Sequence, residues 1–121
     1  LDVNLPDVGQ PFSWAVRANG VIFTSAGPVR DDGSIDTGPI EDQARLTFQN
    51  LQKAMEAGGG TLADVAQVLI YMTDVKDMKV IDGIYREFFT APYPSRSSAA
   101  VQLVVPGMKI ELVAFGAPAA R

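Results

Sequence analysis

Hydrophobic and polar positions alternate with two different periods along the chain, one typical of strands and one of helices. Residues 14–18 and 21–25 are largely apolar runs separated by Asn19 and Gly20. Both positions of a two-residue type I′ turn need positive φ, which Asn and Gly tolerate, so the two runs are predicted to form a β-hairpin. Ala26-Gly27-Pro28 ends the second strand and leaves a loop where backbone N–H groups can approach a ligand.

Helical spacing predicts two helices. Gly38-Pro39 opens the first, because Pro is accommodated in a first helical turn, and Gly58 to Gly60 ends it. Its predicted apolar stripe consists of Ala44, Phe48, Leu51, Met55 and Gly58. The second helix is predicted to start at Thr73 or Asp74 and to end before Pro92. One face of it carries Met78, Ile81, Tyr85 and Phe88, and the other carries Lys79, Asp82 and Arg86.

Three more apolar runs have the length of strands. Residues 65–72 form a nearly continuous apolar run, as expected of a strand that is covered on both faces. Residues 97–105 and 109–116 are predicted to be buried strands, taken to run antiparallel. The order of elements predicts an α+β fold with one mixed sheet and both helices packed on one face. The opposite face then needs another cover, so we expect an obligate oligomer.

The composition limits which partners and which kinds of site the chain can have. At 121 residues, the chain is predicted to be a single domain spanning residues 1–121. A net charge of −4 and scattered Lys and Arg argue against a nucleic-acid partner. The absence of cysteine and histidine excludes disulfides, thiol nucleophiles and the commonest metal ligand. No apolar run is long enough to span a membrane, so we expect no membrane partner and a cytoplasmic location.

Two lone charges lie beside the last two apolar runs. Arg96 follows a loop stiffened by Pro92 and Pro94, and Glu111 lies between Ile110 and Leu112. A rigidly held guanidinium suits bidentate binding of a carboxylate, and a half-buried carboxylate can carry protons. The alternatives are a surface ion pair for Arg96 and a solvent-facing strand position for Glu111.

An ordered set of short motifs covers nearly the whole chain and resembles the RidA/YjgF family of reactive intermediate deaminases. Most telling is the Pro-Ser-Arg of residues 94–96, with Glu111 fifteen residues after the arginine. The other motifs are Pro11-Phe12-Ser13, Phe23-Thr-Ser25-Ala-Gly27, Asn50-Leu51, Asp64-Val65, Tyr71-Met-Thr-Asp74, Tyr85-Arg-Glu-Phe88-Phe89 and Lys109-Ile-Glu111.

This resemblance implies a chorismate-mutase-like fold and a homotrimer whose sheets form an inner barrel, with sites in the clefts between subunits. It implies that Arg96 binds the carboxylate of a small-molecule substrate and that Glu111 positions or activates water. The pocket would be lined by Phe12, Ser25, Ala26, Gly27 and Ser98. The departures from the family pattern are Phe12 in place of Tyr, Ala26-Gly27 in place of Gly-Gln, Ser98 in place of Cys or Thr, and Val113 in place of a second Glu.

The expected geometry requires two chains. If residues 97–105 and 109–116 are antiparallel strands, Arg96 and Glu111 lie about 15–20 Å apart within one chain at ~3.3 Å per residue. We therefore expect Arg96 of one chain to face Glu111 of the next. The predicted function, which the resemblance implies, is hydrolysis of 2-imino or 2-enamino acids to 2-keto acids and ammonia. Because an imine is already electrophilic, we expect neither a metal nor a cofactor.

Other functions stay open. One is deamination of an aromatic ring-cleavage product such as 2-aminomuconate, which the altered pocket positions would accommodate. Another is non-catalytic binding of small carboxylates, and a third is a purely structural or chaperone-like trimer. Ribonuclease activity, a label given to some relatives, is disfavoured by the acidic charge balance and the lack of histidine.

Overall fold

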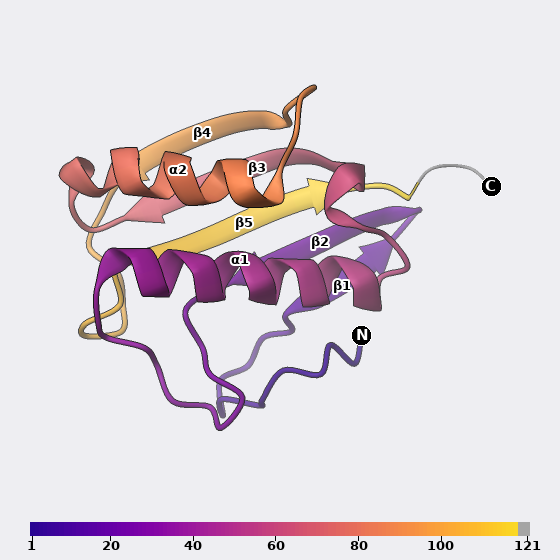
Figure 1. The fold of residues 1–121 in the computed structure, drawn as a ribbon. Helices are drawn as coiled ribbons and strands as arrows, with labels where there is room; N and C mark the ends of the chain where they lie inside the picture. The colour runs from indigo at the N-terminus through magenta and orange to yellow at the C-terminus, as the bar shows by residue number, and fades with distance from the viewer. Residues whose placement is uncertain (119–121) are drawn as a thin grey trace.

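The computed structural model describes residues 1–118, which form one mixed sheet and two α-helices (Figure 1). The elements in chain order are β1 (Ala15–Ala18), β2 (Val21–Ala26), α1 (Ile40–Ala57), the 3-10 turn η1 (Leu62–Asp64), β3 (Val65–Met72), the 3-10 turn η2 (Val75–Asp77), α2 (Met78–Phe88), β4 (Ser95–Ala100) and β5 (Ile110–Gly116). The predicted α+β class is confirmed.

The hairpin and both helices form close to the positions that the turn and helix-end residues predict. Asn19 and Gly20 have φ values of 50° and 78°, as a type I′ turn requires. Helix α1 begins directly after Pro39 and ends at Ala57, before Gly58. Helix α2 begins at Met78, later than predicted, because the Asp74 side chain caps η2 instead, accepting a hydrogen bond of 2.9 Å from the Lys76 N–H.

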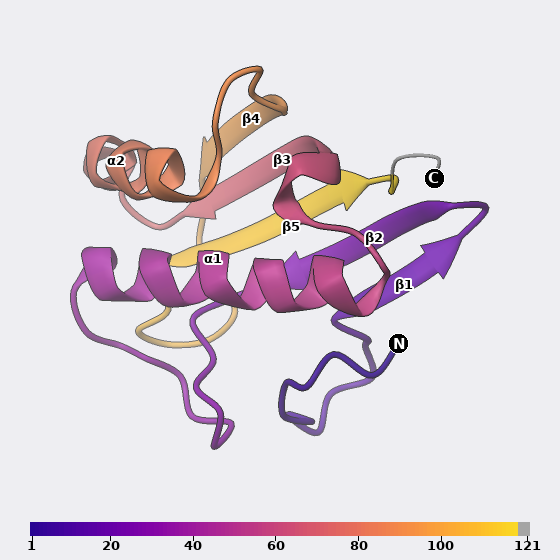
Figure 2. The same cartoon turned by 45° about the vertical axis from the view of Figure 1, so that its right-hand side comes forward.

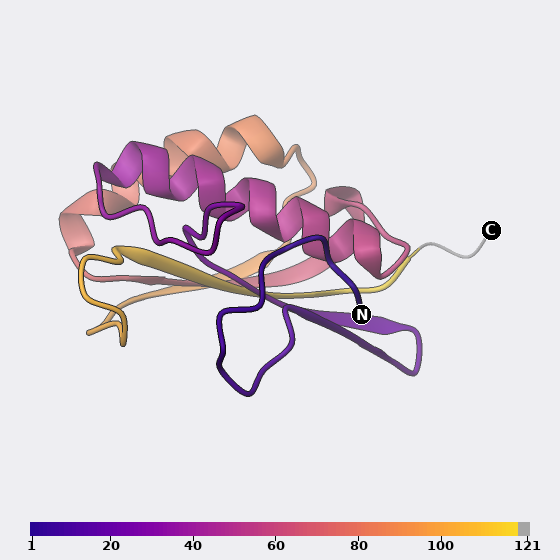
Figure 3. The ribbon, with the colours of Figure 1, turned by 90° about the horizontal axis from the view of Figure 1, so that it is seen from below.

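Both helices lie on one face of the sheet, as predicted, and Figure 3 shows the two layers edge-on. The predicted stripe of α1 is buried against the sheet and α2. Phe48 is fully buried, and its ring lies 5.5 Å from the ring of Phe88 and 5.7 Å from that of Tyr85. These contacts fix α2 over the part of the sheet that holds β3 and β4 (Figure 2).

The last two strands run antiparallel to each other, as supposed from the sequence, but they are not neighbours in the sheet. The strand order is β1-β2-β5-β3-β4, so β3 separates β4 from β5. Helix α2 is a crossover connection that returns the chain in the direction of β3, and β4 therefore pairs parallel to β3. Strand β5 then pairs antiparallel to both β2 and β3.

The prediction of a buried strand over residues 97–105 is wrong in the length and in the burial of that strand. Strand β4 ends at Ala100, which lies opposite Met72, the last residue of β3. Beyond that point only Val101 still donates a backbone hydrogen bond to Met72, because the neighbouring strand has ended. All six residues of β4 are exposed in the single chain, since an edge strand has one neighbour only. Val104, predicted to be buried, is 91% exposed.

The face of the sheet away from the helices is apolar, and no helix or strand within residues 1–118 covers it (Figure 3). Leu69 on β3, and Val113 and Phe115 on β5, are only partly buried. Phe23 on β2 is 41% exposed, and its ring lies 5.4 Å from that of Phe115. We call this surface the open face.

Candidate functional site

Arg96 lies on the helix side of the sheet, at its edge. It stands opposite Val68, a core residue of β3, so its side chain leaves β4 toward α2. Its Nη1 donates a hydrogen bond of 2.7 Å to Oδ1 of Asp82 on α2. The carbon at the centre of the guanidinium lies 4.9 Å from the centroid of the Tyr85 ring. Arg96 is therefore held on one edge by an opposite charge and on one face by an aromatic ring.

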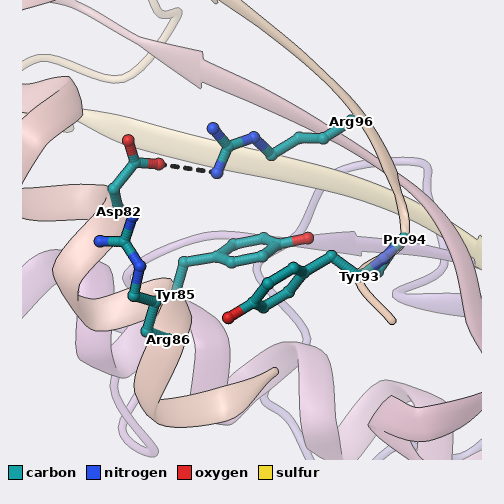
Figure 4. A pocket seen from close by; sticks show the side chains of 6 residues that line it. All are labelled: Asp82, Tyr85, Arg86, Tyr93, Pro94 and Arg96. Atoms are coloured by element: carbon teal, nitrogen blue, oxygen red, sulfur yellow. Dashed lines mark hydrogen bonds and ion pairs between the residues drawn. The ribbon is translucent and has the colours of Figure 1, made fainter. Parts of the chain in front are cut away.

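A cavity of about 260 Å³ opens beside this arginine (Figure 4). Its lining comes from α2 and from the segment that leads into β4, and consists of Asp82, Tyr85, Arg86, Tyr93, Pro94 and Arg96. Two guanidinium groups and one carboxylate meet here beside two aromatic rings. The arrangement suits a small ligand that carries a carboxylate, because the cationic groups outnumber the anionic one.

Tyr85 forms the floor of this cavity. It is 4% exposed, and its ring also stacks on Phe89 at 4.5 Å. Among residues 1–118, its buried hydroxyl has no hydrogen-bond partner. Burial raises the pKa of the phenol, so the group stays protonated and can act as a hydrogen-bond donor.

Glu111 lies on the open face. It stands opposite Tyr71, between the fully buried Ile110 and Leu112 that point toward the helices. Its side chain makes no hydrogen bond or ion pair with any residue in 1–118, and burial raises the pKa of the carboxyl above its ordinary value of 4.5. A carboxylate that is half-buried and unpaired holds a proton more readily than a solvated one, which suits proton transfer.

Within one chain, Arg96 and Glu111 are not brought together. Arg96 is level with Val68 and Glu111 with Tyr71, so three residues along β3 and two strand spacings separate them. At ~3.3 Å per residue and ~4.8 Å per spacing, their Cα atoms lie about 14 Å apart. Their side chains also leave opposite faces of the sheet.

The segment Ser25 to Gly27 lies nearer to Glu111 than to Arg96. Ser25 stands opposite Val113, on the open face, which places it diagonally across from Glu111 at about 7–8 Å. Ala26 is buried toward the helices, and the Gly27 carbonyl accepts a hydrogen bond of 2.9 Å from the side chain of Asn50. Helix α1 thus anchors the loop.

Phe12 and Ser98 lie apart from each other. Phe12 belongs to the N-terminal arm, is 44% exposed and packs edge-on against Trp14 at 4.6 Å. Ser98 is on β4, two residues after Arg96, and its side chain leaves the same face of the sheet. Its neighbour on β3 is Ile70. The predicted residues therefore fall into two groups within one chain. Ser98 lies on the Arg96 side of the sheet, Ser25 to Gly27 lie near Glu111, and Phe12 belongs to the N-terminal arm.

Sequence reasoning missed the partners of Arg96. The sequence pattern places Asp82 and Arg86 on the face of the second helix away from the core. The available signal was the spacing of Asp82, Tyr85 and Arg86, which puts them on neighbouring positions of one helical surface. That surface faces Arg96 only because β4 lies beside β3.

Residues 1–118 contain neither a candidate metal site nor a helix that could cross a membrane. No three side chains of His, Cys, Asp or Glu within residues 1–118 come together as a possible metal site. Over the same range, neither α-helix has the length and apolar character needed to cross a membrane.

Comparison with known proteins identifies the family. The sequence profile of the family described as endoribonuclease L-PSP matches residues 3–117. The chain belongs to this family, the YjgF/RidA family. The chain is 33% identical over 112 residues to protein mmf2, mitochondrial, of Schizosaccharomyces pombe, covering 90% of this chain and 89% of that protein. It is 31% identical over 104 residues to a 2-iminobutanoate/2-iminopropanoate deaminase of Dermatophagoides farinae, covering 84% and 81%.

A solved family structure has the same fold. Escherichia coli TdcF with bound serine superposes with a TM-score of 0.88 at 27% identity, covering 98% of this chain and 97% of that chain. The mixed sheet with two helices on one face is thus a YjgF/RidA fold.

Proposed function

We propose that this YjgF/RidA protein is a deaminase that hydrolyses 2-imino and 2-enamino acids to 2-keto acids and ammonia without a cofactor. The observation that carries the proposal is Glu111, half-buried and unpaired within residues 1–118, with a raised pKa. A relative at 31% identity is named 2-iminobutanoate/2-iminopropanoate deaminase, which supports the same reaction class.

In the proposed mechanism Arg96 binds the substrate carboxylate through charge-assisted hydrogen bonds. Glu111 takes a proton from a water molecule whose oxygen attacks the imine carbon, and the C=N double bond opens to a carbinolamine. The protonated Glu111 then gives its proton to the nitrogen. The hydroxyl of the carbinolamine then gives its proton to the ionised Glu111, which passes it to the departing nitrogen. The C–N bond breaks, ammonia leaves, the hydroxyl oxygen becomes the carbonyl of the keto acid, and Glu111 is again a carboxylate. One water is consumed for each ammonia released.

The proposed site is shared between two chains of a homotrimer. Arg96 and Glu111 leave opposite faces of the sheet, so one substrate can touch both only if a second chain supplies one of them. The apolar open face, which carries Glu111 and Phe23, gives such a chain a surface to bury. Ser25, Ala26 and Gly27 would line the Glu111 side of the cleft, and Ser98 the Arg96 side. Phe12 would reach the cleft from the arm.

The test is release of ammonia and pyruvate from 2-iminopropionate generated in situ, compared with the rate without protein. We expect acceleration by the wild type, a loss of about 10²–10⁴-fold in Glu111→Gln, and a loss of about 10- to 100-fold in kcat/KM in Arg96→Ala. The matched controls are Glu56→Gln and Arg45→Ala, which make the same charge changes on α1 outside both sides of the site. Both controls should keep wild-type rates.

The alternatives predict different results in this assay. A non-catalytic carboxylate binder would bind the keto acid through Arg96 without accelerating ammonia release. A deaminase of a ring-cleavage product would be inactive on 2-iminopropionate and active on 2-aminomuconate. A cytoplasmic location stays a prediction, and the relative mmf2 carries the description mitochondrial.

A further inference from the structure

The ion pair between Asp82 and Arg96 changes what the arginine can bind. Nη1 of Arg96 already donates to Oδ1 of Asp82 at 2.7 Å, and both groups line the cavity of about 260 Å³. Their side chains are 31% and 29% exposed for Arg96 and Asp82, so water screens the pair only in part. With Tyr85 beneath the guanidinium, the remaining N–H groups of Arg96 are those available to a ligand.

A carboxylate that binds those groups must lie near the carboxylate of Asp82. For a simple anion this proximity is repulsive. For a ligand with a positive nitrogen on the carbon next to its carboxylate, the same Asp82 charge is attractive, because the nitrogen can lie between the two carboxylates. Arg86 keeps the cavity cationic on balance, so the carboxylate is still attracted while Asp82 discriminates among carboxylates.

We propose that Asp82 is a specificity-determining residue that makes the Arg96 site prefer carboxylates with a cationic nitrogen on the adjacent carbon. The proposal rests on the assignment of Arg96 as the carboxylate-binding residue. The preferred class comprises protonated 2-imino acids and 2-amino acid zwitterions. The 2-keto acid product has lost the positive nitrogen, so Asp82 favours its release over that of the substrate.

The test compares two probes that differ only at that nitrogen, alanine and propionate. Their dissociation constants are measured by NMR titration of the wild type and of Asp82→Asn. Asn keeps a carbonyl oxygen that accepts the Arg96 N–H, so Arg96 stays positioned while the charge is removed. We expect alanine to bind about threefold more weakly to the variant and propionate about threefold more tightly, a shift of about tenfold in their ratio.

Glu87→Gln is the matched control. Glu87 lies on the same helix and pairs with Arg45 at 2.9 Å, away from the cavity. The control removes the same charge and should leave the alanine to propionate ratio unchanged. Thermal melting of each variant checks that the fold is retained.

The outcomes separate this proposal from the proposed function. Equal changes for both probes in Asp82→Asn, or an unchanged ratio, would overturn the role of Asp82 and leave the deaminase assay unaffected. Failure of the wild type to bind either probe would also overturn it. If Arg96→Ala binds both probes as the wild type does, the carboxylate assignment is wrong, and both proposals lose their basis.

Discussion

Mixing two impaired variants should restore activity if the proposed catalytic pair is shared between chains. Arg96→Ala retains Glu111, and Glu111→Gln retains Arg96, so neither variant alone holds a complete pair. When both are unfolded together and refolded, some oligomers will place an intact Arg96 beside an intact Glu111 of the neighbouring chain. Within one chain, the two residues lie on opposite faces and two strand spacings apart, so no chain can complete the pair alone.

The size of the recovery follows from this geometry. Each shared site takes Arg96 from one chain and Glu111 from the next around a cyclic oligomer. With equal amounts of the two variants, each requirement is met with a probability of about one half, so about one quarter of the sites are complete. We therefore expect about a quarter of the wild-type rate of ammonia release from 2-iminopropionate, per mole of chain.

A second mixture provides the control. Wild type mixed with equal Arg96→Ala/Glu111→Gln double variant should give about one quarter of the wild-type rate if sites are shared, and about one half if each site lies in one chain. No recovery in the mixture of the two single variants, together with one-half activity in the control mixture, would refute the shared site. Mixing the folded variants without unfolding tests how fast chains exchange.

Three further predictions concern the pH dependence, the sheet and the open face. Burial raises the pKa of Glu111, so the ionised carboxylate is less stable in the folded state, and the Tm should fall as pH rises from 4.5 through the raised pKa. Glu111→Gln should lack this fall in Tm. Identical Tm profiles for the wild type and the variant would contradict the prediction. Gly116→Ala should lower the free energy of unfolding by about 1–3 kcal/mol, because a Cβ there would press on the backbone of Asp64. Gly83→Ala on α2 meets nothing within 4 Å and should raise the free energy of unfolding by about 0.5–1 kcal/mol. Urea titration of both variants measures these opposite changes. Phe23→Glu, at an exposed position of the open face, should shift the protein toward single chains in size-exclusion chromatography with light scattering, and an unchanged mass would argue against that face as the interface.

The elements that the sequence predicted well are those with local causes. Asn19-Gly20 specifies its turn because the two residues tolerate positive φ. Pro39 and Gly58 bound α1 through backbone effects that act within one turn. The apolar stripe of α1 was recognisable because a helix that packs on a sheet must repeat its buried positions every three or four residues.

The end of β4 had no local cause. Val101 to Val105 are as apolar as a strand, and β-propensity favours them. The strand nevertheless stops at Ala100, because its partner β3 stops at Met72. A strand needs a neighbour for its hydrogen bonds, and the neighbour's length is set some thirty residues earlier in the chain.

The sequence likewise predicted some features of the candidate site and not others. Arg96 and Glu111 attract notice in the sequence because a charge beside a buried strand requires a partner. The partner of Arg96 could not be found there, since Asp82 faces it only after α2 has crossed over β3 and β4 has paired on its far side. The proposed role of Glu111 depends on Arg96 of a second chain, which the sequence of one chain does not place beside it.

The amino-acid sequence by itself thus determined the hairpin, the two helices, the α+β class and the two lone charges, since periodicity and turn chemistry act between residues close in the chain. The tertiary structure alone decided that β5 lies between β2 and β3, that Arg96 pairs with Asp82 above Tyr85, and that Arg96 and Glu111 leave opposite faces. Those features follow from pairing between distant segments, and a single-residue shift of register would turn every side chain of a strand to the other face.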